Sequence, residues 1–221
     1  MLTLYIGNKN YSSWSMRPWV LLKQAGIAFD EVMVRFDSFN SPDSEFKRAI
    51  LAVNPGGRVP VLVDDGFAVW DTLAIAEYLN EIKPKAQLLP ADIKARAHCR
   101  AICGEMHSGF ASMRSSLPMN IKARFPAFKV WSRAQGDIDR VLEIWKECLA
   151  TYGGPYLFGK QPTVADAMYA PVVTRFLTYD VAIDKASAGY CKRIMELPAM
   201  KEWIATAKAE PDEIDELDAE F

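Results

Sequence analysis

The chain of 221 residues has little of several features that define whole classes of protein. Its 26 lysines and arginines nearly balance 28 aspartates and glutamates, so the charge pattern does not favour a nucleic acid as partner. No apolar run approaches the roughly 20 residues needed to span a membrane. The apolar stretch 2–6 follows Met1 without a secretory signal pattern, and we therefore expect a cytoplasmic protein.

Cysteine and histidine, the residues of many metal sites, are also scarce. The chain contains Cys99, Cys103, Cys148, Cys191, His98 and His107. Cys99 and Cys103 are one helical turn apart, which would place two thiols on one face. Metal sites usually need a second clustered pair, so we expect these two cysteines to be small core residues and expect no metal. Neither histidine is assigned a role.

The first part of the chain alternates between strand and helix patterns. Apolar runs predict strands at 2–6, 29–34, 61–63 and 67–70, and helical patterns cover 19–25, 43–49 and 71–82. This order predicts a parallel opening unit followed by an antiparallel hairpin. We expect a mixed sheet of about four strands with helices on both sides.

The second part of the chain shows no convincing strand. A segment with two prolines at 84–90 is typical of a linker, so we predict domains at 1–83 and 91–221. Helices are expected at 91–117, 127–151, 163–179, 186–196 and 199–208, with a frayed or loosely docked acidic tail at 211–221. Thr163 and Asp166 have the spacing of a capping box, which we interpret as an ordinary helix cap.

The hairpin region from Arg58 to Thr72 carries the first ligand-binding pattern. Pro60 forces Val59 to be extended at the edge of a strand, and Asp71 and Thr72 stand where the following helix begins. An extended residue beside a helix N-terminus can hold a short peptide. The peptide backbone would pair with Val59, and its polar end would lie on the helix.

Three serines, Ser12, Ser13 and Ser15, lie in the loop between the first strand and the first helix, where open α/β sheets often bind ligands. Each is open to two interpretations, a helix cap or a hydroxyl aimed at a ligand. A nucleophilic serine is not favoured, because no Gly-x-Ser-x-Gly elbow is present. A hydroxyl that donates to a thiolate needs no base. It lowers the pKa of the thiol, helped by the positive end of the helix.

These motifs together, in this order, resemble a cytosolic glutathione transferase of the serine type, close to the zeta class. The matching segments are YSSWSMR at 11–17, NPGGRVP at 54–60, DTLAIAEYL at 71–79 and TVAD at 163–166. The resemblance implies a thioredoxin-like α/β N-terminal domain, an all-helical C-terminal domain and a homodimer. It also implies glutathione as substrate, with no metal.

The resemblance assigns the site residues as well. Val59 would pair with the cysteinyl backbone of glutathione, with Pro60 cis, and Asp71 and Thr72 would hold its γ-glutamyl end. Ser15 and Arg58 complete the expected binding set. The thiolate-stabilising hydroxyl is Ser12 if the motif is aligned on its first serine, and Ser13 if it is counted back from the arginine. Both are candidates, and the alignment without gaps favours Ser12.

One departure bears on the reaction. Zeta-type members carry a cysteine where this chain has Trp14, so the loop has no cysteine for thiol exchange. We therefore expect conjugation of glutathione to a small hydrophobic electrophile, bound by the helical domain. A glutathione-dependent isomerase or peroxidase, or a non-catalytic glutathione-binding protein, are the alternatives. Aromatic residues of the helical half, namely Phe125, Phe128, Trp131 and Trp145, suggest a surface for the homodimer.

Overall fold

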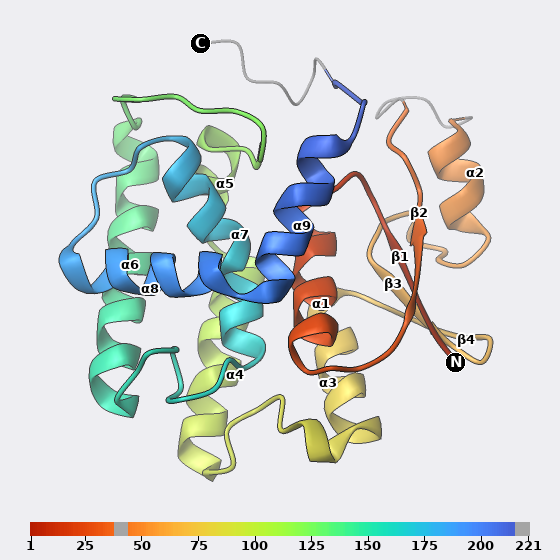
Figure 1. Ribbon diagram of the computed structural model, residues 1–221, viewed down its shortest axis with the longest axis horizontal. Helices are drawn as coiled ribbons and strands as arrows, with labels where there is room; N and C mark the ends of the chain where they lie inside the picture. The colour runs from red at the N-terminus through yellow and green to blue at the C-terminus, as the bar shows by residue number, and fades with distance from the viewer. Residues whose placement is uncertain (38–43, 215–221) are drawn as a thin grey trace.

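The structure is a computed structural model that describes residues 1–37 and 44–214. These residues form four strands, nine α-helices and one short 3₁₀ helix (Figure 1). The elements are β1 (Leu2–Ile6), α1 (Ser13–Gln24), β2 (Asp30–Met33), α2 (Glu45–Leu51), β3 (Val61–Asp64), β4 (Phe67–Trp70), α3 (Thr72–Ile82), η1 (Pro84–Ala86), α4 (Ile93–Ser108), α5 (Ala111–Ser116), α6 (Ser132–Tyr152), α7 (Val164–Thr178), α8 (Lys185–Glu196) and α9 (Pro198–Ala209).

The four strands form one mixed sheet in the order β2-β1-β3-β4. β1 is parallel to β2, whereas β1 and β3, and β3 and β4, are antiparallel. Figure 1 shows α1 and α3 between the sheet and the helical half, with α2 on the opposite side. Leu2, Leu4 and Ile6 alternate into the core, as the period of a half-buried strand requires. The predicted mixed sheet with its helical second domain is confirmed.

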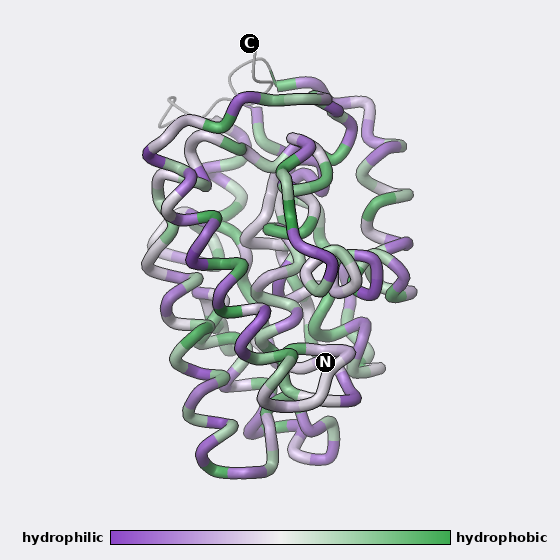
Figure 2. Tube along the Cα trace, turned by 90° about the vertical axis from the view of Figure 1, so that its left-hand side faces the viewer, coloured by the Kyte–Doolittle hydropathy of each residue, from purple (hydrophilic) through white to green (hydrophobic). Residues whose placement is uncertain are grey.

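The helical half is built around α7. Nearly all of its residues are buried, and it packs against α1, α4 and α8. The outer helices alternate hydrophilic and hydrophobic segments along their length in Figure 2, as expected for helices with one buried face. At the start of α7, the Asp166 carboxylate accepts the N–H of Thr163 at 2.8 Å, so the capping box is present. Because α7 also packs against α1, it joins the helical half to the first domain.

Several helix boundaries differ from the sequence prediction. α1 begins at Ser13 rather than at residue 19, because Pro18 is tolerated inside the helix and costs it a single backbone hydrogen bond. The helix expected at 91–117 is broken. Phe110 has a left-handed backbone with φ of 56°, which separates α4 from α5. α6 begins at Ser132 instead of 127. Part of the helix expected at 43–49 lies outside the described residues, and α2 covers Glu45–Leu51.

The aromatic residues and cysteines of the helical half lie mainly inside it. Trp145 is fully buried, and the rings of Phe125 and Phe128 lie 5.2 and 5.0 Å from that of Tyr179. Of the four aromatic residues offered above as a dimer surface, Trp131 alone is largely exposed, at 66%. All four cysteines are buried and unbridged, so Cys99 and Cys103 are core residues as predicted. No helix of the described chain is long and apolar enough to cross a membrane.

The tail is docked rather than frayed as far as the structure describes it. The Glu210 carboxylate accepts the N–H groups of Lys9 and Asn10 at 2.7 and 3.0 Å. The N–H of Ile214 donates to the hydroxyl of Tyr11 at 3.2 Å. Of the two expectations for the tail, frayed or loosely docked, docking applies to residues 211–214, and residues 215–221 lie outside the described chain. The docked segment braces the loop that leads to Ser12.

Candidate active site

The loop between β1 and α1 places Ser12 and Ser15 against each other. Ser12 precedes α1, but its side chain caps none of the helix N–H groups. Its Oγ lies 2.7 Å from Ser15 Oγ, which also accepts the N–H of Gly7 at 3.1 Å. Ser15 is completely buried and lines neither of the cavities described below, so its contact with a ligand stays a prediction. The geometry makes Ser15 a support for Ser12.

Ser13 opens α1 and is held by two buried arginines. Arg17 Nη1 donates to the backbone oxygen of Ser13 at 3.0 Å, and Arg175 Nη2 donates to its Oγ at 3.2 Å. Burial and the like charges of Arg175 and Arg114 hold the pKa of Arg17 well below its usual range. Burial and Arg114 likewise lower the pKa of Arg175 to about 10. Within the described residues no carboxylate pairs with these three cations, so the region beside the serines favours an anion.

The loop before β3 presents a free backbone segment. The Asn54 side chain organises it, accepting the N–H of Gly56 at 2.8 Å and donating to the oxygen of Arg58 at 2.7 Å. The Val59–Pro60 peptide bond is cis, as predicted. Within residues 1–37 and 44–214, the N–H and C=O of Val59 have no hydrogen-bond partner. Val59 therefore keeps its backbone available for pairing with an extended ligand.

Asp71 is strained and uses both of its carboxylate oxygens. Its backbone has φ of 76°, a conformation that costs a non-glycine residue about 1–3 kcal/mol. Oδ1 accepts the N–H groups of Leu73 and Ala74, capping α3. Oδ2 lies 2.5 Å from Nε2 of His107 in α4. The carboxylate is thereby fixed at the junction of the two domains.

Thr72, the first residue of α3, has a buried hydroxyl without a partner. Thr72 Oγ1 makes no hydrogen bond in the described structure, although the residue is only 4% exposed. A buried polar group left unpaired costs about 1–3 kcal/mol. Because it stands at the positive end of α3, this hydroxyl suits the oxygen of a bound anion.

Two adjoining cavities contain most of the predicted site. The first, of about 570 Å³, is lined by Trp14, Asn54, Gly56, Arg58, Val59, Pro60, Trp70, Asp71, Thr72, His107 and Arg114. The second, of about 410 Å³, is lined by Tyr11, Ser12, Ser13, Trp14, Phe36, Asp37, Phe46, Lys47, Gly57, Arg58 and Val59. Trp14, Arg58 and Val59 belong to both. The structure thus brings Ser12, Ser13 and the γ-glutamyl candidates to two cavities that share lining residues.

Trp14 is one of the residues that line both cavities. Its ring centroid lies 4.1 Å from the guanidinium carbon of Arg17 and 5.3 Å from that of Arg114. The ring of His107 meets it edge-on at 5.4 Å. Cation–π contacts of this kind hold an aromatic ring in place. The residue that replaces the zeta-class cysteine is therefore a fixed part of the site.

Sequence reasoning missed four side chains of this site, namely Lys47, His107, Arg114 and Arg175. His107, Arg114 and Arg175 lie on helices of the second domain, where no local pattern links them to the first domain. His107 lies in α4 and Arg114 in α5, on either side of the break at Phe110, so a helical spacing between them gave no signal. Lys47 lies in α2, where no pattern of the sequence linked it to the serines.

A larger groove lies elsewhere, along the linker. It has a volume of about 780 Å³ and is lined by residues 84–91 and by the starts of α4 and α7, but by none of the predicted site residues. Arg100, on its wall, is already paired with Glu77 at 2.8 Å.

In the part of the chain that the structure describes, no three His, Cys, Asp or Glu side chains are gathered as a metal site would require.

Comparisons with known proteins agree with this architecture. The model of the glutathione S-transferase N-terminal domain matches residues 11–82, and that of the C-terminal domain matches residues 129–206. Maleylacetoacetate isomerase of Rattus norvegicus is 28% identical over 170 residues, covering 77% of this chain and 76% of its own. Glutathione S-transferase Z2 of Arabidopsis thaliana is 26% identical over 212 residues, covering 92% of each.

Solved structures show the same fold. A glutathione transferase homolog from Burkholderia, solved with bound glutathione, is similar with a TM-score of 0.71 and 24% identity, over 95% of this chain and 99% of its own. Isozyme E7 of Drosophila melanogaster glutathione S-transferase has a TM-score of 0.69 and 25% identity, with 95% of each chain covered. This chain shares with them a thioredoxin-like domain followed by a helical domain, and these two domains define its fold class. The chain belongs to the glutathione S-transferase family, and its enzyme class is glutathione S-transferase.

Proposed function

We propose that the chain binds glutathione across the two adjoining cavities and activates its thiol as a thiolate with serine hydroxyls. In this proposal, residues 1–83 hold glutathione and residues 91–221 supply the pocket for a small hydrophobic electrophile. The supporting observation is the unpaired, buried hydroxyl of Thr72 beside the fixed carboxylate of Asp71, in the cavity that also holds the free backbone of Val59.

The two ends of glutathione carry charges that the site complements. Asp71 would receive the amino group of the γ-glutamyl end, and the Thr72 hydroxyl would donate to its carboxylate. The glycyl carboxylate needs a cation at the other end. Lys47 and Arg58 both line the second cavity and are suited to that role. Val59 would pair with the peptide between the two ends.

The serines would stabilise the sulfur. In the conjugation step the thiol loses its proton to water, the sulfur forms a bond to carbon of the electrophile, and the electrophile's leaving group departs. Ser12 is the first candidate donor and Ser13 the second, and both line the cavity next to Val59. Because the Ser12 side chain caps none of the α1 N–H groups, a plain capping role does not account for it.

Glutathione-dependent isomerisation is the second candidate. It is supported by relatives named maleylacetoacetate isomerase, such as the rat protein. Isomerisation also uses a glutathione thiolate, so it would employ the same serines. Trp14, which lines both cavities, stands where zeta-type members carry a cysteine, and the loss of that thiol favours conjugation.

The test is a pH titration of bound glutathione by the ultraviolet absorbance of its thiolate, in the wild type, Ser12→Ala and Ser13→Ala. We expect the wild type to lower the thiol pKa and Ser12→Ala to raise it again. In Ser12→Ala, turnover of a chlorinated aromatic electrophile should be slower than in the wild type at neutral pH and should recover partly at alkaline pH. Ser108→Ala is the control, since this exposed hydroxyl donates to Gly104 O within α4. An unchanged thiol pKa in both serine variants would contradict the serine mechanism, and a wild type without turnover would favour a binding protein.

A two-fold homodimer and a cytoplasmic location complete the proposal, as is typical of the family. Phe67, in edge strand β4, is 63% exposed, more than Trp70 of the same strand at 45%. An exposed edge with a large apolar side chain is a natural place for a second copy to pack. It replaces the helical-half aromatics as our candidate contact.

A further inference from the structure

Arg175 of α7 is a buried guanidinium that reaches from the helical domain to the first domain. It is 5% exposed. Nε donates to the oxygen of Leu117 at 2.8 Å, and Nη1 to that of Pro171 at 3.3 Å. Nη2 donates to Ser13 Oγ at 3.2 Å. Its three partners are thus two carbonyls and a hydroxyl.

A buried cation of this kind is costly. The titratable groups around it are Arg17 and Arg114, which carry the same charge, and Tyr179. Replacing buried charges with hydrophobic side chains is often neutral or stabilising, so fold stability alone is a weak reason for the charge. The bond to Ser13 is the one that leaves the helical domain, and a hydrophobic side chain could not make it.

The bond from Arg175 fixes the direction of the Ser13 proton. A guanidinium donates hydrogen bonds and cannot accept them, so it occupies a lone pair of Ser13 Oγ. The Ser13 O–H must then point elsewhere. Among residues 1–37 and 44–214 this O–H has no acceptor, and Ser13 lines the 410 Å³ cavity. The proton is therefore available to a ligand in that cavity.

Ser12 differs in this respect. Its hydroxyl lies against Ser15, whose oxygen accepts the neutral N–H of Gly7. No charged group takes part in that chain. Of the two serines, Ser13 is the one that lies a single hydrogen bond from a buried positive charge, and such a bond polarises the hydroxyl and makes it a stronger donor.

We propose that Arg175 is a positioning residue for thiolate formation, acting through Ser13. It aims the Ser13 proton at the sulfur of bound glutathione and brings positive charge within two hydrogen bonds of that sulfur. The thiol proton leaves to water, and the sulfur accepts the Ser13 O–H. No bond of Arg175 is made or broken. The inference rests on the proposed function, and it makes Ser13 a full second donor beside Ser12.

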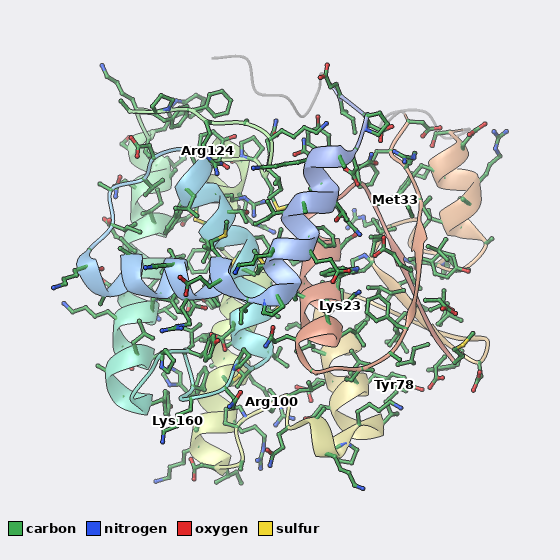
Figure 3. All side chains as sticks on the ribbon, viewed as in Figure 1. Lys23, Met33, Tyr78, Arg100, Arg124 and Lys160 are labelled. Carbon is green, nitrogen blue, oxygen red and sulfur yellow. The ribbon has the colours of Figure 1, made fainter. Side chains whose placement is uncertain are left out.

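The experiment compares Arg175→Met, Ser13→Ala and the double variant by the pH titration of bound glutathione. We expect each single variant to raise the thiol pKa by about one unit, a roughly tenfold loss of thiolate at a pH below the pKa. The double variant should give the same shift as either single one, because both remove one pathway. Arg124→Met is the control. Arg124 is exposed and lies in the upper part of the helical half (Figure 3).

Circular dichroism and thermal unfolding check that each variant is folded, since Arg175 also binds two carbonyls. If Arg175→Met does not fold, Arg175→Gln carries the test, because it keeps hydrogen bonding and removes the charge. A folded Arg175 variant with an unchanged thiol pKa overturns the inference, as do additive shifts in the double variant. If Ser12→Ala alone raises the pKa, the proposed function stands and this inference fails. If the wild type does not lower the pKa of bound glutathione, the proposed function itself fails.

Discussion

At the scale of a single residue, a substitution of Thr72 distinguishes an effect on glutathione binding from an effect on folding. Thr72→Val keeps the shape of the side chain and removes a hydroxyl that has no partner in the free protein. A hydrogen bond to a charged group contributes about 1.5–3 kcal/mol, so we expect the Kd for glutathione to rise at least about tenfold. The free energy of unfolding should stay the same or increase. Calorimetric titration and urea unfolding measure the two quantities.

The neighbouring Asp71 provides the contrast. Because its carboxylate caps α3, Asp71→Ala should weaken both binding and stability. Thr206→Val is the matched control for Thr72→Val, since the Thr206 hydroxyl donates a hydrogen bond within α9. An unchanged Kd for Thr72→Val, together with lower stability, would mean that Thr72 serves the helix alone.

Single residues also show what sequence reasoning can reach. Val59, Pro60, Asp71 and Thr72 were predictable because a proline and a helix start fix their local geometry, and the structure brings them to one cavity. His107 touches Asp71 from 36 residues away, and no local pattern encodes such a contact. Side chains that enter a site from another domain depend on packing, which a single sequence does not reveal.

At the scale of elements, Asp166 at the start of α7 predicts a pH dependence of stability. Burial raises the pKa of its carboxyl to about 6, despite hydrogen bonds from Thr163, Leu157 and Tyr190. The folded state therefore holds this proton more tightly than the unfolded state, whose carboxyl has an ordinary pKa near 4. The contribution of Asp166 to stability should fall by up to about 3 kcal/mol as the pH rises from about 4 to about 6, and then level off.

The measurement is urea unfolding of the wild type and Asp166→Asn across that range. The difference between their free energies of unfolding should shrink with rising pH. Asp184, the cap of α8, is the control of opposite sign, because hydrogen bonds from Ser187 lower its pKa. Its contribution is present above the ordinary pKa and is lost as the pH falls through the lowered one. If the free energy of unfolding of the wild type, relative to that of Asp166→Asn, instead grew with rising pH, Asp166 would be ionised in the folded state throughout this range.

The helices show where pattern reading succeeds and fails. α7 was predicted within a residue at each end, because the Thr163 cap and the long apolar run both mark it. α1 was predicted six residues short, because a proline normally marks a helix start and Pro18 here lies inside. The break between α4 and α5 begins at Gly109, the C-cap of α4, and this glycine is a local stop signal that the prediction passed over. Phe110 then takes a left-handed backbone, which its residue type does not favour.

At the scale of the whole molecule, the exposed edge of the sheet predicts the contact between two copies. We expect a dimer mass by light scattering at micromolar concentration, and a monomer mass for Phe67→Ser, because burial of this ring would be lost. Trp131→Ser tests an exposed aromatic residue of the helical half. A dimer that survives Phe67→Ser and dissociates with Trp131→Ser would move the interface there. A monomeric wild type would contradict the homodimer altogether.

The docked tail has a consequence for the order in which the protein is made. Glu210 binds the backbone of Lys9 across 201 positions of sequence, and Ile214 binds Tyr11 across 203. A ribosome releases the strands of the first domain long before it adds these two residues. The nascent chain can therefore assemble its sheet early, but the loop that carries Ser12 gains these braces only after Glu210 and Ile214 have been added. If the proposed function holds, a chain interrupted before these residues would have its sheet without the braced loop that thiol activation needs.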